Sequence, residues 1–199
     1  MSFNGSSSRL SSEAKALAET VATGLLWRGN GPLWGSMQGP GGEVTDNFED
    51  AFARLFDLDY VLAVNSGTSA NEAAVASLGL NPGDEVICPA ACPPFVPLAV
   101  LAAGAVPVFA DVCPDRMVLT AETIKAALSP RSRAIVVVHL WGIPAPIPEL
   151  LSLAGQFDLH VNEDCAQALG AKLNNRYLGS FGASASFSLQ QSKQLTCGE

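Results

Sequence analysis

The sequence predicts an α/β fold, a three-layer α/β/α domain in which helices cover both faces of a mostly parallel sheet. From residue 60 onward, short apolar segments alternate with turns and helical patterns. The apolar segments are runs of Val, Ile and Ala without polar alternation, which is typical of strands buried on both faces. With 48% hydrophobic and 15% charged residues, the chain can also fill a large core, which argues against disorder.

The N-terminal segment 1–45 is predicted to be an arm and a substrate-side loop, followed by one large domain over 46–199. Ser and Gly are frequent in this segment, and its stretch GNGPLWGSMQGPGGE has too many turn formers for a regular element. The regular elements are therefore expected to begin near residue 45.

The first element is a helix over 45–58, in which four apolar residues recur at helical spacing and Thr45 or Asp46 can cap the start. Six strands follow, each an apolar run beside turn formers: 60–65, 81–89 after its entering turn, 105–112, 133–140, 159–166 and 184–189. Four helices lie between them: 67–80, 95–104, 120–128 and 147–158. The second of these ends at Gly104, and the third has Thr120 as its cap, with Thr123 in place of the acid of a full capping box.

The bulk properties exclude several classes of function. A net charge of −8 leaves no basic surface for nucleic acid. The N-terminus lacks the apolar region of a signal peptide, and the longest apolar run contains two prolines and a glycine and is too short to cross a bilayer comfortably. The five cysteines are odd in number and irregularly spaced, which favours neither disulfides nor a zinc site. We therefore expect a cytoplasmic protein with no metal, no nucleic-acid partner and no membrane partner.

Ligands in open parallel sheets bind beyond the carboxyl ends of the strands, so the polar residues that follow each strand are the candidates for a site. The first group, Ser66, Gly67 and Thr68, lies between a strand and a helix. Free N–H groups at a helix start, together with hydroxyls, can bind a phosphate. The alternative is an ordinary N-cap turn. Neither a Walker loop nor a Rossmann fingerprint is present.

The second group follows the strand 159–166, where Glu163 and Asp164 stand side by side. A carboxylate there is costly to bury unless a cation or a strong donor faces it. Asp164 is the candidate partner of a cationic ligand nitrogen, and Gln167 lies one helical turn later on the same side. The alternative is a helix-capping acid or a satisfied ion pair.

The third group follows the last predicted strand. A lysine at a strand end in a water-poor site can attack a carbonyl through its neutral amine, and Lys193 is the candidate for this role. Ser188, five residues earlier, adds a second hydroxyl that can reach a phosphate. Taken alone, Lys193 also fits a solvated surface lysine. His139 ends another strand and fits a structural hydrogen-bonding role better than that of a base.

Together these groups supply what pyridoxal phosphate (PLP) needs. The phosphate would bind at the helix start, the aspartate would keep the pyridine nitrogen protonated, and the lysine would form the Schiff base. No other common cofactor explains all three groups.

Five stretches of the chain, in order, resemble the DegT/DnrJ/EryC/StrS-type sugar or cyclitol aminotransferase family, a branch of the PLP-dependent aspartate-aminotransferase fold. They are NSGTSANEAAVASLGLNPGDEVICP, AGAVPVFADV, VVVHLWGIPA, VNEDCAQALGA and GSFGASASFSLQQSKQLTCGE. The D-x-x-Q pattern of Asp164 and Gln167 and the S-x-x-x-x-K pattern of Ser188 and Lys193 are the most specific part of the resemblance.

The resemblance implies a role for each matched position. Lys193 would hold the cofactor and shuttle protons, and Asp164 would pair with the pyridinium nitrogen. Gln167 would contact the 3-oxygen side of the ring. Ser66, Gly67, Thr68 and Ser188 would surround the phosphate.

The implied activity is amino transfer from glutamate or glutamine to a nucleotide-linked keto-sugar or a keto-cyclitol, in antibiotic or other sugar biosynthesis, by a homodimer with shared active sites. Relatives with histidine at the lysine position are PLP-dependent sugar dehydratases, so Lys193 favours transamination. A degenerate, non-catalytic partner or regulatory module is the remaining alternative.

Two departures from the family pattern matter. Pro93 stands where the resemblance implies an aromatic ring stacked on the cofactor, which would weaken binding. The chain also stops at Glu199, where relatives continue, so we expect only the N-terminal portion of such an enzyme, without its smaller C-terminal domain.

Overall fold

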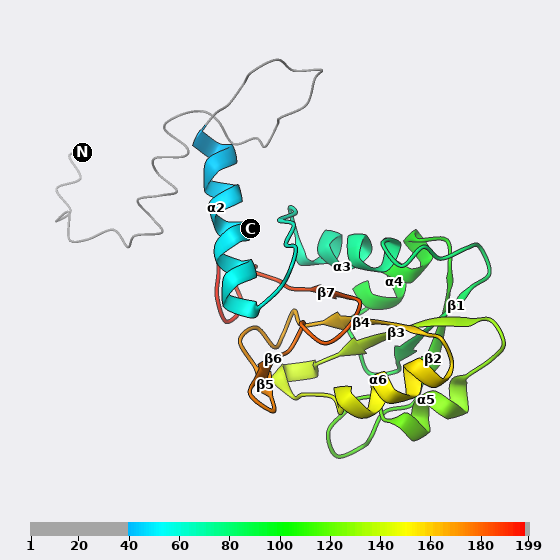
Figure 1. The fold of residues 1–199 in the computed structure, drawn as a ribbon. Helices are drawn as coiled ribbons and strands as arrows, with labels where there is room; N and C mark the ends of the chain where they lie inside the picture. The colour runs from blue at the N-terminus through cyan, green and yellow to red at the C-terminus, as the bar shows by residue number, and fades with distance from the viewer. Residues whose placement is uncertain (1–39, 198–199) are drawn as a thin grey trace, which may run out of the picture. The chain divides into compact units, whose positions relative to one another are not determined.

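The computed structural model describes residues 40–197, with side chains from Thr45 onward. The chain divides into two compact units, one up to Ala63 and one from Val64 (Figure 1). Each unit is described below by itself. The predicted boundary between residues 45 and 46 stays a prediction, since most of the segment before it lies outside the described residues.

The first unit contains helix α2, Pro40–Phe56. The helix begins earlier than predicted, so the prediction of loop up to residue 43 and of a cap at Thr45 or Asp46 is wrong at this point. Proline is well accepted in the first turn of a helix, because its missing N–H would have no partner there anyway. The aromatic spacing does mark the helix, since the Phe52 and Phe56 rings stack with centroids 4.3 Å apart.

The prediction of a strand over 60–65 is wrong. Among the described residues this segment joins no sheet, and Tyr60 and Leu62 are 94% and 65% exposed. Strand formation requires a neighbouring strand that satisfies the backbone. Here the Ala63 N–H instead donates a 2.6 Å hydrogen bond to Glu49 Oε1.

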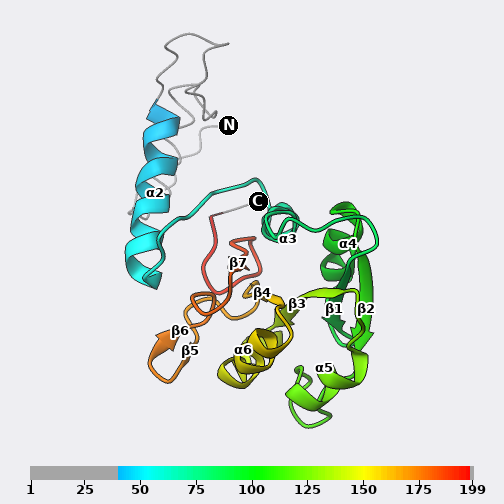
Figure 2. The same ribbon diagram turned by 45° about the vertical axis from the view of Figure 1, so that its right-hand side comes forward.

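The second unit is built on a parallel five-stranded sheet with strand order β2-β1-β3-β4-β7 (Figure 2). Its strands are β1 (Glu85–Pro89), β2 (Val106–Ala110), β3 (Ser132–Val138), β4 (His160–Asp164) and β7 (Ser184–Ser186). Five of the six predicted strands are therefore present, although the last one is shorter than predicted. All their carboxyl ends lie at one edge of the sheet.

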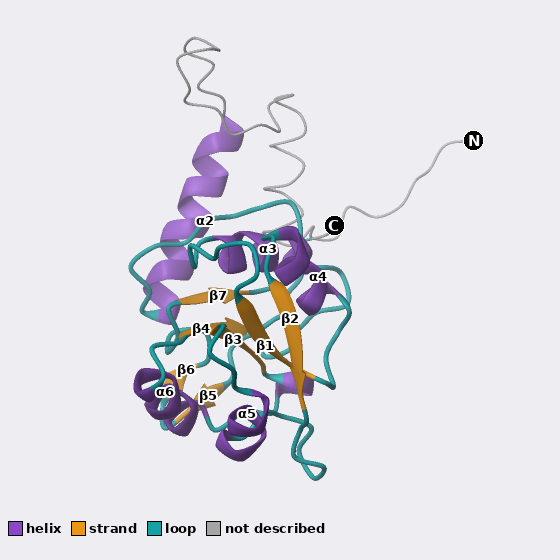
Figure 3. Ribbon diagram, turned by 90° about the vertical axis from the view of Figure 1, so that its right-hand side faces the viewer, coloured by secondary structure: helices purple, strands orange, loops and turns teal. Residues whose placement is uncertain are grey.

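Two helices cover each face of the sheet, which confirms the three-layer prediction (Figure 3). The helices are α3 (Gly67–Ala76) and α4 (Phe95–Ala102) on one face, and α5 (Ala121–Ala127) and α6 (Ile147–Gln156) on the other. Successive strand residues point to opposite faces. Val86 and Val136 accordingly pack in the α4 layer, whereas Ile87 and Ile135 pack in the layer of α5 and α6.

Local signals explain the helix ends. Gly104, with φ of 78°, follows α4 as predicted. Thr120 caps α5, and here the structure goes further than the prediction, because the Thr123 hydroxyl also accepts from the Thr120 N–H and completes a reciprocal capping box. Among the described residues, no helix is long and apolar enough to cross a membrane.

A small hairpin was not predicted. Strands β5 (Lys172–Leu173) and β6 (Arg176–Tyr177) pair in antiparallel fashion around Asn174 and Asn175, whose φ angles are 50° and 64°. Two consecutive asparagines with positive φ are typical of a two-residue hairpin turn. This turn chemistry is a signal that the sequence offered.

Candidate cofactor site

The carboxyl edge of the sheet brings most of the predicted site residues together. Asp164 ends β4 and pairs in register with Ser186 of β7, and Ser188 follows two residues later. All three side chains are buried. They lie on the face that α3 covers, because Asn162, two residues before Asp164, donates to Asn71 of that helix at 3.3 Å.

The start of α3 offers backbone donors at this edge. Ser66 is the N-cap, with its Oγ accepting from the Ser69 N–H at 3.1 Å, and the Ser66 carbonyl accepts from Ala70. The first N–H groups of a helix have no intrahelical acceptor, which leaves those of Gly67 and Thr68 pointing out of the helix start. The N-cap alternative is thus correct for Ser66, and it is compatible with anion binding by the next two residues.

Gly67 is closely packed against the end of β7. A Cβ atom at this position would lie 2.7 Å from Ser188 Cβ and 2.9 Å from Ser188 Oγ, both too close for real contacts. The glycine therefore lets the start of α3 approach Ser188, a residue two positions beyond β7, and this brings the Ser188 hydroxyl to the helix start. These are the elements of an anion cradle.

Asp164 is 7% exposed, and its Oδ1 accepts a 2.9 Å hydrogen bond from the Ala166 N–H. Burial raises the pKa of Asp164 above its ordinary value, and this effect exceeds the opposing effects of the Ala166 hydrogen bond and of the Lys193 charge. Burial therefore disfavours the charged form of this carboxyl. A protonated ring nitrogen placed against it would favour the carboxylate.

Lys193 lies in a turn whose N–H donates to Gln190 O at 2.8 Å. The next residue, Gln194, donates from Nε2 to the backbone oxygen of Gln167 at 2.9 Å. This bond ties the lysine turn to the turn after β4, and the Lys193 ammonium is near enough to lower the pKa of Asp164. The structure thus brings Asp164 and Lys193 to the same place.

The Gln167 side chain is held by the segment that follows β3. Its Oε1 accepts a 2.9 Å hydrogen bond from the Trp141 N–H. Trp141 has a φ of 54° inside the short helix Leu140–Gly142, which presents that N–H to the glutamine. Because the oxygen is used in this way, Gln167 offers its Nε2 as a donor.

Two residues near the site were not singled out from the sequence. Ser186 is 2% exposed, and its Oγ has no hydrogen-bond partner. Cys92 follows β1, and burial, followed by the Asp164 charge, raises the pKa of its thiol to about 11. The alternation of Ser184, Ser186 and Ser188 in the sequence could have indicated Ser186. The position of Cys92 depends on the loop that also carries Pro93, which no local pattern predicts.

His139 is buried and hydrogen-bonded, as its structural interpretation predicted. Its Nε2 lies 3.1 Å from Glu163 Oε2, and its Nδ1 accepts from the Ala145 N–H at 3.2 Å. Glu163, His139 and Cys165 lie close enough to hold a metal ion. However, backbone N–H groups already point at both Glu163 oxygens, and a cation there would face these donors.

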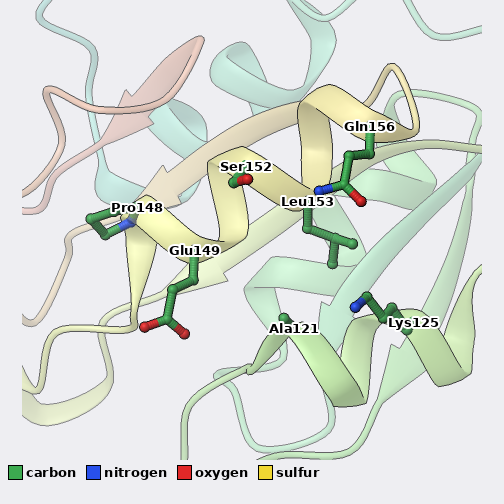
Figure 4. A pocket seen from close by; sticks show the side chains of 7 residues that line it. All are labelled: Ala121, Lys125, Pro148, Glu149, Ser152, Leu153 and Gln156. Atoms are coloured by element: carbon green, nitrogen blue, oxygen red, sulfur yellow. The ribbon is translucent and has the colours of Figure 1, made fainter.

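A separate groove of about 410 Å³ lies between α5 and α6 and contains none of the predicted site residues (Figure 4). Its lining is formed by Ala121, Lys125, Pro148, Glu149, Ser152, Leu153 and Gln156.

Comparison with known proteins decides the family. Residues 34–199 match the model of the DegT/DnrJ/EryC1/StrS aminotransferase family. The chain belongs to this family. Its members and structural neighbours are PLP-dependent, and the fold predicted from the resemblance is confirmed.

Among its relatives, the chain is 37% identical over 188 residues to L-glutamine:2-deoxy-scyllo-inosose aminotransferase of Streptomyces kanamyceticus, covering 92% of this chain and 42% of the relative. It is 46% identical over 147 residues to UDP-N-acetyl-3-dehydro-alpha-D-glucosamine 3-aminotransferase of Acidithiobacillus ferrooxidans, covering 74% and 40%. Among solved structures, NtdA from Bacillus subtilis with bound cofactor PMP superposes with a TM-score of 0.78 at 30% identity, covering 94% and 39%. The chain thus spans less than half the length of these proteins.

The residues at the edge of the sheet fit PLP. The close approach of Gly67 and Ser188 leaves room where a phosphate would fit, and the buried carboxyl of Asp164 suits a cationic ring nitrogen. The unpartnered Ser186 hydroxyl adds a buried donor beside Asp164. The individual roles of these residues stay predictions.

Proposed function

We propose that this chain is the cofactor-binding part of a PLP-dependent aminotransferase that moves an amino group from glutamine or glutamate to a keto-sugar or keto-cyclitol. The observation that carries the proposal is the meeting of Asp164 and Lys193 at the carboxyl edge of the sheet. A buried acid with a raised pKa beside an amine is typical of a functional site.

Each residue would have a distinct role. Gly67 and Thr68 would bind the phosphate with backbone N–H groups, and Ser66 and Ser188 would add hydroxyls. Gln167 would donate from Nε2 to the ring's 3-oxygen. When bound, PLP supplies an electron sink for the amino acid and keto substrates.

Asp164 and Lys193 would act on protons. Asp164 would hold a proton at the ring nitrogen, since pairing with that cation offsets the cost of burying its carboxylate. Lys193 Nζ would hold the cofactor at its carbonyl carbon and move a proton to and from the reacting substrate carbon. The Lys193 charge acts on Asp164, which supports this division of roles.

The substrate class rests on the names of the relatives. One is named for L-glutamine and a keto-cyclitol, and another for a nucleotide-linked dehydro-sugar. We propose the same two classes here. A homodimer and a cytoplasmic location are part of the same proposal.

The first test is covalent trapping. The protein is incubated with PLP, reduced with borohydride, digested and analysed by mass spectrometry. The phosphopyridoxyl group should be found on Lys193, and Lys193→Ala should abolish the visible absorbance band of the bound cofactor. Lys172→Ala is the matched control, because Lys172 stacks on Tyr177 in the β5–β6 hairpin and should not affect the label.

The second test measures amino transfer from glutamine and glutamate to keto-cyclitols and nucleotide-linked keto-sugars. Formation of the amino product, dependent on Lys193, is the expected result. Loss of the sugar hydroxyl without amine incorporation would indicate a dehydratase instead. Absence of both PLP labelling and turnover would favour a non-catalytic relative.

A further inference from the structure

Glu163 is a fully buried carboxylate on which four hydrogen bonds converge. Oε1 accepts from the N–H groups of Phe181 and Gly182, each at 2.7 Å. Oε2 accepts from the Gly179 N–H at 2.9 Å and meets His139 Nε2 at 3.1 Å. Three of the donors belong to one loop, 179–182, which leads directly into β7.

This loop is shaped to surround the carboxylate. At Gly182 a Cβ would lie 2.5 Å from the carbonyl oxygen of Val161, so only glycine lets the loop approach β4 this closely. Gly179 has a φ of 89°, and a Cβ there would collide with the Phe187 ring. Successive backbone N–H groups that converge in this way form an anion-binding nest, which Glu163 fills from within the chain.

His139 extends the arrangement to the end of β3. Because its Nδ1 accepts from the Ala145 N–H, its Nε2 carries the proton and donates to Glu163. The backbone N–H of His139 also donates to the backbone carbonyl of Asp164 at 3.1 Å. One carboxylate therefore connects the ends of β3 and β4 with the start of β7.

The cofactor residues lie on the other face of the same strands. Glu163 and Asp164 are consecutive in β4, so their side chains point to opposite faces of the sheet. The loop fixed by Glu163 continues through Ser184 to Ser186, the ladder partner of Asp164. A shift of the loop would therefore displace Ser186 and Ser188 relative to Asp164 and the α3 start.

We propose that Glu163 and His139 are positioning residues for the cofactor site, which they hold in place from the far side of the sheet. The inference rests on the proposed function and deepens it. A carboxylate is required because it can accept from all four donors, whereas an amide has one accepting oxygen and turns its own N–H groups toward the remaining donors. Replacement of Glu163 by the uncharged Gln is thus expected to open the loop 179–182 without changing the volume of the side chain.

The test compares PLP affinity among variants of the purified protein, by titration of the visible absorbance and circular dichroism of the bound cofactor. Glu163→Gln should weaken PLP binding by about tenfold and alter the visible dichroism, since it breaks hydrogen bonds to a charged group. Val100→Ala is the control, because Val100 is fully buried in the core cluster beneath α4, whereas the loop residue Phe181 packs against the other cluster. At a temperature where both variants are folded, it should stay within about twofold of the wild type.

Two variants of His139 provide a second, independent test of the proposal. His139→Gln keeps one donor for Glu163 and one acceptor for Ala145 and should retain PLP affinity, whereas His139→Leu keeps neither and should lose it. This pair decides the question even where Glu163→Gln does not fold. Equal affinity and dichroism in Glu163→Gln and Val100→Ala, or in the two His139 variants, would overturn the positioning role alone. Failure of the wild type to bind PLP would instead overturn the proposed function and this inference with it.

Discussion

The Gln194 side chain donates a 2.9 Å hydrogen bond to the backbone carbonyl of Gln167, and this bond joins the turn that carries Lys193 to the turn that follows Asp164. Residues that are distant in sequence thereby meet beside one strand end. The bond lies at an exposed position, so its contribution is to geometry more than to overall stability.

Gln194→Ala should therefore weaken PLP binding by about threefold to tenfold, which corresponds to the loss of one hydrogen bond. The melting temperature should change little. Gln191→Ala is the matched control, since Gln191 is an exposed glutamine in the same turn. Equal PLP affinities of the two variants, measured by absorbance titration, would contradict the role of this bond.

Gly67→Ala should lower the free energy of unfolding by about 1 to 3 kcal/mol, because the new methyl group would overlap Ser188 at 2.7 Å. Gly155→Ala is the control, since a Cβ there meets nothing within 4 Å in α6 and should stabilise the helix slightly. Urea unfolding measures both. The double variant Gly67→Ala with Ser188→Gly should recover part of the loss, and strict additivity would count against the steric explanation.

Ser186→Ala should leave the cofactor-free protein equally stable or more stable by about 1 kcal/mol, because a buried hydroxyl without a partner is costly. Ser184→Ala, on the same face of β7, should destabilise it by about 1 kcal/mol, since Ser184 Oγ bonds Asn162 Oδ1 at 3.0 Å. Urea unfolding without PLP compares the two. A clear loss in Ser186→Ala would mean that the hydroxyl has a partner.

Asp164→Asn should stabilise the cofactor-free protein at neutral pH and weaken PLP binding. Burial raises the folded-state pKa of Asp164 above 3.8, so its contribution to stability falls as the pH rises above the unfolded-state value. The advantage of the variant should accordingly grow as the pH rises through the acid range, in urea unfolding at several pH values. An advantage that shrinks with rising pH would show a lowered pKa instead.

Much of the fold could be predicted because its signals are local. The apolar runs of β1 to β4 and the caps at Ser66 and Thr120 depend on residues a few positions apart. Strand 60–65 was predicted wrongly because a strand depends on a neighbour that no local pattern supplies. Helix α2 began early because Pro40 is as compatible with a helix start as with a loop.

The sequence by itself determined the family, the parallel α/β architecture and the candidate residues at the strand ends, since each follows from residue types at fixed spacing. Only the tertiary structure decided what the neighbouring acids do. The strand directs Asp164 toward the α3 face beside Lys193, and it directs Glu163 into the loop 179–182. The contact of Gly67 with Ser188 was likewise set by packing between distant segments, because steric fit depends on three-dimensional proximity that residue spacing does not encode.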